Sequence, residues 1–155
     1  MRKILFLLPL FFLGCSVSDT TVKVKKFTQC YVHKLPAPFW VCYQSSFLSV
    51  GKVHVTKLTR LKQEEAYSLG VSELIAKLQS KTRLFFRKLN ITDKKIDSEI
   101  KNFVILNAIQ GDSWYDAKEK VIYVQVKINK SEYKKFLFEK FGKNPKFKSA
   151  FDETF

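Results

Sequence analysis

The sequence is poor in the side chains that most often carry catalysis. Its 155 residues include only two histidines, His33 and His54, and three cysteines. It contains no CxxC pair, no HExxH motif, no phosphate-binding loop and no glycine-rich nucleotide turn. The two histidines lack the close spacing of a metal site or a catalytic triad. Asp112 and Asp116 flank an expected turn, where aspartates commonly serve turn geometry. We therefore expect no enzyme activity, no catalytic residue, no metal and no cofactor.

A long hydrophobic run is also missing at the N-terminus. The apolar stretch 4–13 is too short to cross a bilayer, which takes roughly 20 residues. It follows Arg2 and Lys3 and precedes Gly14 and Cys15, which is the order of a secretory signal built for lipid attachment. We therefore interpret the start of the chain as the core of a cleavable signal rather than as a membrane span.

The residues around Cys15 resemble a bacterial lipobox, with Phe12 where leucine is usual. We expect 1–14 to be a lipoprotein signal peptide and Cys15 to be the lipidation site, carrying acyl chains such as palmitate. Ser16 stands where aspartate would signal retention in the inner membrane, by resemblance to enteric bacteria. The predicted location is therefore the cell outer membrane, reached through a lipid anchor. An ordinary signal peptide with a chance cysteine is the alternative.

Acidic residues are scarce, with 14 Asp and Glu against 28 Lys and Arg, for a net charge of +14. This balance favours anionic partners such as phospholipid or lipopolysaccharide headgroups, acidic protein surfaces or nucleic acid. The lysines are scattered along the chain, so a solvated basic surface is the default interpretation. We do not expect nucleic acid as a partner, because an exported lipoprotein seldom meets it.

Once Cys15 is assigned to the lipid, Cys30 and Cys42 remain as a pair in an oxidising compartment. A disulfide between them would close a short loop and stabilise the domain by about 2–3 kcal/mol through the unfolded chain. Two free thiols are the alternative.

The rest of the chain predicts one α+β domain, in which a three-stranded antiparallel sheet carries a long helix and shorter helices on one face. Hydrophobic periodicity indicates strands, at period two, and helices, at periods of three and four. The expected segments are a lipidated tether over 15–34, the domain over 35–142 and an aromatic tail over 143–155. Within the domain the expected elements are an extended strap over 35–41, strands over 47–56, 109–115 and 121–128, and helices over 61–89, 97–106 and 129–142.

Two features of these elements carry further expectations. Gly70 interrupts the long helix at a cost of about 1 kcal/mol relative to alanine, which close packing against the strand near Gly51 would offset. In the last strand Tyr123, Gln125 and Lys127 face away from the apolar side, so we expect an open sheet face there. These three residues are the candidate interaction face.

Several short motifs, taken in order, resemble a family. They are Pro38 to Trp40, Val50-Gly51, Glu65-Ala66, Glu73-Leu74, Asp112 to Trp114 and Val121 to Val126. In these the chain is similar to the Lpp-twenty lipoproteins of Helicobacter and Campylobacter relatives, which include the flagellar P protein. The resemblance implies an outer-membrane lipoprotein of structural or surface character, in some members associated with the flagellar sheath or basal disc, and no enzyme.

Two hypotheses of function follow. The first is a structural or assembly role in the cell envelope, with the flagellum as a candidate location and a second copy or an envelope protein as the partner. The alternative is a monomeric binding module whose basic surface captures an anionic ligand or a host surface.

Overall fold

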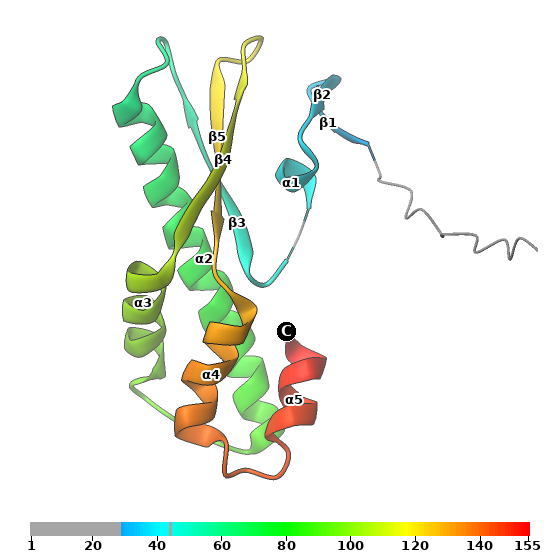
Figure 1. The fold of residues 1–155 in the computed structure, drawn as a ribbon, viewed down its shortest axis with the longest axis vertical. Helices are drawn as coiled ribbons and strands as arrows, with labels where there is room; N and C mark the ends of the chain where they lie inside the picture. The colour runs from blue at the N-terminus through cyan, green and yellow to red at the C-terminus, as the bar shows by residue number, and fades with distance from the viewer. Residues whose placement is uncertain (1–28, 44) are drawn as a thin grey trace, which may run out of the picture.

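The computed structural model describes residues 29–43 and 45–155, and its centre is a three-stranded sheet backed by one long helix (Figure 1). The strands are β3 (Leu48–His54), β4 (Ile109–Asp116) and β5 (Val121–Lys127), in the order β3-β5-β4 with antiparallel neighbours. The helix α2 (Arg60–Leu89) packs along one face of the sheet against β3 and β5. The predicted α+β fold with a three-stranded antiparallel sheet is therefore confirmed.

The ends of α2 follow from local chemistry. Thr59 caps its first turn, because its side chain accepts a hydrogen bond from the Lys62 backbone N–H at 3.3 Å. Asn90 ends the helix in the left-handed conformation. Arg87 and Lys88 lie in the last turn, where positive charge complements the helix dipole. The apolar stripe between these ends faces the core and consists of Ala66, Gly70, Leu74, Leu78, Phe85, Phe86 and Leu89.

Helix α2 and strand β3 approach each other backbone to backbone at two glycines, as predicted. A Cβ atom built on Gly51 would lie 1.7 Å from the Ala66 carbonyl oxygen and 2.6 Å from the Gly70 nitrogen. One built on Gly70 would lie 2.9 Å from the Gly51 nitrogen. The Ser49 hydroxyl donates a 2.6 Å hydrogen bond to the Gly70 carbonyl across the same contact. The two glycines thus let the helix lie closer to the sheet than side chains would allow.

The second half of α2 forms a helical end with three further helices. These are α3 (Ile96–Asn107), α4 (Lys130–Phe141) and α5 (Phe147–Thr154). The predicted aromatic tail is α5, and its Phe147 and Phe151 are buried against Phe85, with ring centroids 5.4 Å and 6.2 Å away. The tail predicted over 143–155 is therefore a helix docked on the core.

One polar pair lies inside this core. Thr82, the one polar member of the α2 stripe, donates to the Leu78 carbonyl at 2.8 Å and lies 2.6 Å from the Tyr133 hydroxyl. Both residues are fully buried. Burial raises the pKa of Tyr133, although its hydrogen bond to Thr82 opposes the shift. The pair therefore remains neutral and satisfied, which removes the cost of burying two hydroxyl groups.

Candidate functional site

A small N-terminal unit lies apart from the helices, beside the central sheet (Figure 1). It consists of the hairpin β1 (Cys30–Val32) and β2 (Leu35–Ala37), followed by the single helical turn α1 (Phe39–Cys42). We call residues 29–43 the strap. It is longer than the extended strap predicted over 35–41, and that prediction is wrong for 39–41, which lie in α1. The predicted tether boundary at residue 34 is therefore wrong, because it cuts this hairpin. The folded unit includes β1.

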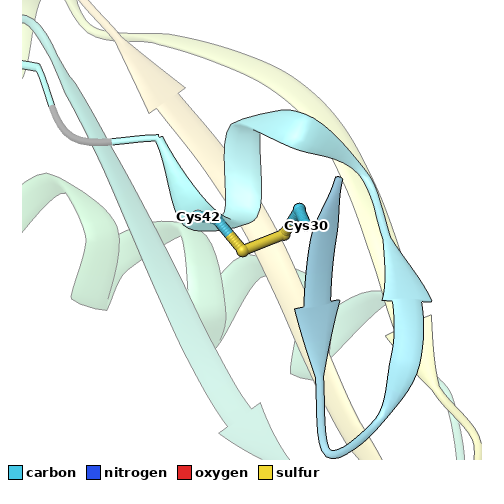
Figure 2. The surroundings of a disulfide bond; sticks show 2 residues. All are labelled: Cys30 and Cys42. Atoms are coloured by element: carbon cyan, nitrogen blue, oxygen red, sulfur yellow. A yellow bond between two sulfur atoms is a disulfide. The ribbon is translucent and has the colours of Figure 1, made fainter. Parts of the chain in front are cut away.

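A disulfide between Cys30 and Cys42 closes the strap, joining α1 to β1 (Figure 2). The two Cα atoms are 5.7 Å apart, within the usual range for a bridge. Cys30 is buried, whereas Cys42 is exposed. Of the two alternatives left open by the sequence, the structure has the bridged pair. The bridge makes a unit of fifteen residues into a closed structure that hydrophobic burial alone would not hold.

The turn of the hairpin is conformationally costly. Val32 pairs with Leu35, so the loop has two residues, and both have positive φ angles, 49° at His33 and 66° at Lys34. Such turns usually contain asparagine or glycine, because a side chain disfavours this region. A contact outside the hairpin must therefore hold His33 in place.

That contact is with Asp116 at the end of β4. His33 Nδ1 lies 3.2 Å from Asp116 Oδ2, and because a carboxylate only accepts, Nδ1 donates. The Asp116 side chain is fully buried, and its other oxygen accepts backbone N–H bonds from Lys118 at 3.0 Å and Glu119 at 3.1 Å. We call the His33–Asp116 contact the clasp. It joins residues 83 positions apart in the chain.

The clasp and the β4–β5 turn together determine whether the Asp116 carboxyl is protonated. Burial alone would raise the pKa of this carboxyl. The hydrogen bonds from the Glu119 backbone, the His33 ring and the Lys118 backbone outweigh burial and hold the pKa of Asp116 below its usual value. Asp116 is thus a charged acceptor, and both of its oxygens hold hydrogen bonds.

This arrangement predicts how stability depends on pH. Folding lowers the pKa of the Asp116 carboxyl below its value in the unfolded chain, which is about 3.9. The charged carboxyl therefore stabilises the native state at any pH above about 3.9, and this stabilisation is lost as the pH falls through the lower pKa of the folded state. Asp116→Asn should therefore lower the thermal midpoint at pH 7, and the gap from the wild type should close as the pH is lowered below about 4. Thermal unfolding of both proteins across this pH range measures it. A gap independent of pH would contradict the role of the charge.

The strap covers part of the sheet face that we expected to be open, and that expectation is wrong for two of its three residues. Tyr123 is 7% exposed and Gln125 is 9% exposed, whereas Lys127 is exposed as expected. Helix α1 contacts β5, and the Trp114 ring lies 5.2 Å from the Tyr123 ring. Gln125 is buried because its side chain lies over Gly111, where a Cβ would meet Gln125 Oε1 at 2.1 Å.

Two clefts have Tyr123 in their lining. The first, of about 290 Å³, is lined on its polar side by His33, Lys52, His54 and Glu119. It brings both histidines of the chain together, which their separation in the sequence did not indicate. No local signal could have revealed this, because His33 reaches the sheet only when the strap folds back onto Asp116.

The second cleft, of about 220 Å³, is lined by strap residues Val41 and Tyr43 and by Glu73 and Lys77 of α2. Lys77 Nζ donates to the backbone carbonyls of Ser45 at 3.2 Å and Leu48 at 2.6 Å. Burial lowers the pKa of Lys77, and the charge of Glu73 opposes the shift. This lysine therefore ties Ser45 and the start of β3 to α2 instead of standing free for chemistry.

The site as a whole is a strap that a disulfide closes, held on the sheet by the clasp and by the contact of α1 with β5. Within residues 29–43 and 45–155 no group of three His, Cys, Asp or Glu side chains is placed to hold a metal ion. In the same part of the chain, no helix has the length and apolar character needed to cross a membrane. Cys15, the predicted lipidation site, lies outside the described residues. No family model and no curated protein matches the chain.

Proposed function

We propose that this protein is an exported lipoprotein, anchored to the outer membrane through Cys15, whose domain has a structural or assembly role in the cell envelope. The disulfide between Cys30 and Cys42 carries the proposal. Structural disulfides persist in oxidising compartments and are rare in the bacterial cytoplasm. A bridge in the described structure therefore supports the export that the signal and lipobox predict.

The strap gives such a lipoprotein a firm attachment point. It is the first described part of the chain, so it lies between the proposed anchor and the core. The disulfide closes it, and the clasp and the contact of α1 with β5 hold it to the sheet. Force from the membrane side would thus pass into a cross-linked unit before it reaches the central sheet.

An exposed apolar group supports the assembly role. Ile105, Leu106 and Ile109, at the junction of α3 and β4, are 54%, 81% and 54% exposed. Neighbouring exposed apolar side chains mark protein contacts more often than a solvated surface does. β4 is also an edge strand of the sheet. We propose a second copy or an envelope protein as the partner, and the resemblance to the Lpp-twenty lipoproteins adds the flagellar sheath or basal disc as a location.

The anchor is tested by Cys15→Ser in cells. This change removes the sulfur that would carry the lipid, so we expect the protein to leave the membrane fraction almost completely. The measurement is immunoblotting of membrane and soluble fractions after a high-salt wash, which removes electrostatically bound protein.

The matched control is the double variant Cys30→Ser with Cys42→Ser. It removes the same chemical group twice but leaves Cys15, so it should stay with the membranes. Recovery of Cys15→Ser in washed membranes at the wild-type level would overturn the anchor.

A further inference from the structure

The positive charge of the described residues is concentrated at one end of the molecule. Two segments, 87–95 and 140–148, contain eight cationic side chains and one acidic side chain, Asp93, for a net charge of +7. All eight cationic residues are exposed. We call this surface the basal tip, and its cations are Arg87, Lys88, Lys94, Lys95, Lys140, Lys143, Lys146 and Lys148.

The fold, not the sequence, brings the two segments together. The first contains the end of α2 and the loop to α3, and the second contains the end of α4 and the loop to α5. Asn144 Nδ2 donates to the Leu89 carbonyl at 3.4 Å, and the rings of Phe86 and Phe141 lie 4.8 Å apart. Figure 1 shows both loops at the end of the molecule opposite the β4–β5 turn.

Few of these charges are neutralised within the described structure. Lys88 pairs with Glu153 at 2.7 Å, and Lys140 pairs with Glu99 at 2.9 Å. The other six cations form no ion pair there. Asp93 accepts the Lys95 backbone N–H at 2.8 Å, which is a turn contact and not a side-chain pair. The basal tip therefore presents uncompensated positive charge to the solvent.

The opposite end of the molecule has a smaller excess. The β4–β5 turn, residues 116–120, contains Lys118 and Lys120 against Asp116 and Glu119. The β3–α2 connection at the same end (Figure 1) adds Lys57 and the start of α2 adds Arg60 and Lys62, but Arg60 pairs with Glu64 and Lys62 with Glu65. Charge is thus unequal along the long axis. A protein that needed charge only for solubility would gain nothing from this inequality, whereas one that meets an anionic surface would be oriented by it.

We infer that the basal tip binds the anionic headgroups of the lipid bilayer to which the chain is anchored. This inference rests on the proposed lipid anchor. The tether enters the domain at the strap, which lies toward the β4–β5 turn and away from the basal tip (Figure 1). Between Cys15 and Gln29 the chain spans at most about 50 Å when fully extended, more than the roughly 45 Å length of the 30-residue helix α2, so the tether is long enough for the tip to reach the membrane. One lipid anchor together with a basic patch holds a protein to a membrane far better than either alone. In this protein Cys15 would carry the lipid anchor, and the basal tip would be the basic patch.

The test uses unacylated protein, Ser16 to Phe155, which contains every described element and the whole core. We measure sedimentation with vesicles of phosphatidylcholine alone and of phosphatidylcholine with one quarter phosphatidylglycerol, in 50 mM and 500 mM salt. Binding should require phosphatidylglycerol and be lost at high salt. Polyphosphate in solution serves as a competitor, which separates a soluble phosphate polymer from a headgroup surface as the ligand.

Two variants with the same net charge locate the binding surface. The tip variant changes Lys94, Lys95, Lys143 and Lys146 to glutamine, and we expect its partition to anionic vesicles to fall about tenfold or more. The control variant changes Lys57, Lys101, Lys118 and Lys135, all exposed and outside the tip, to glutamine and should bind within about twofold of the wild type. Circular dichroism confirms that both are folded.

Three results would overturn the inference. They are no dependence on phosphatidylglycerol, an equal loss in both variants, and tight binding of polyphosphate without binding to vesicles. None of them bears on Cys15, because the protein used here has no lipid. Failure of the basal tip is therefore distinguishable from failure of the anchor, which cell fractionation tests.

Discussion

Gly51→Ala should leave the protein unable to form its native helix–sheet contact. The added Cβ would lie 1.7 Å from the Ala66 carbonyl oxygen, far inside contact distance, and that atom belongs to the backbone of α2. Relief therefore requires the whole helix to move off the sheet, which also breaks the hydrogen bond from Ser49 to Gly70. Overpacking typically costs about 1–3 kcal/mol, and a rigid backbone clash costs more. We expect a loss above about 3 kcal/mol of a total of roughly 5–15 kcal/mol.

Gly111→Ala is the matched control. Its Cβ would meet Gln125 Oε1 at 2.1 Å, but this atom is the end of a flexible side chain that can turn away. Thermal unfolding should therefore show a small shift for Gly111→Ala and a collapse, or absence of a folded baseline, for Gly51→Ala. Equal midpoints in the two variants would mean that α2 and β3 do not approach as described.

Tyr123→Lys should unfold or strongly destabilise the domain. Tyr123 is 7% exposed, and burial raises the pKa of its hydroxyl, with the charges of Asp116 and Glu119 adding to the shift. A lysine there would place a charge under the strap and remove the ring that packs on Trp114. Burying an unpaired charge and losing an aromatic contact together cost about 3–5 kcal/mol.

Tyr123→Phe and Lys127→Ala are the companions for this change. The first keeps the ring, and the second removes an exposed residue from the same strand face, so both should stay within about 1 kcal/mol of the wild type. Urea unfolding monitored by circular dichroism measures all three. A Tyr123→Lys protein of wild-type stability would show that the strap does not cover this face.

The central fold could be predicted because its signals are local. The stripe along α2 repeats every three or four residues over 30 residues, and β5 alternates at period two. Gly70 in a helix interior already pointed to a close approach, since it otherwise destabilises the helix. These patterns depend only on which nearby side chains lie on the same face of a helix or strand. They can therefore be recognised in the sequence without knowledge of contacts between distant residues.

The covered face could not be predicted, because its signals are long-range. The run Tyr123, Gln125 and Lys127 has the polar character of an open face. Its burial depends on Gly111 across the sheet and on a strap that returns through the clasp. The clasp joins His33 and Asp116, which are 83 positions apart, and no sequence pattern indicates that two residues at this separation are in contact. The basal tip was missed for the same reason, since its lysines are scattered in the sequence and gathered only by the fold.

The lipid anchor and the disulfide are tested most directly by the intact mass of the protein extracted from membranes by detergent, measured before and after reduction. We expect a chain that begins at Cys15, carries acyl chains and gains two hydrogens on reduction, as the bridge between Cys30 and Cys42 opens. A chain without acyl groups, or one whose mass does not change on reduction, would contradict this expectation.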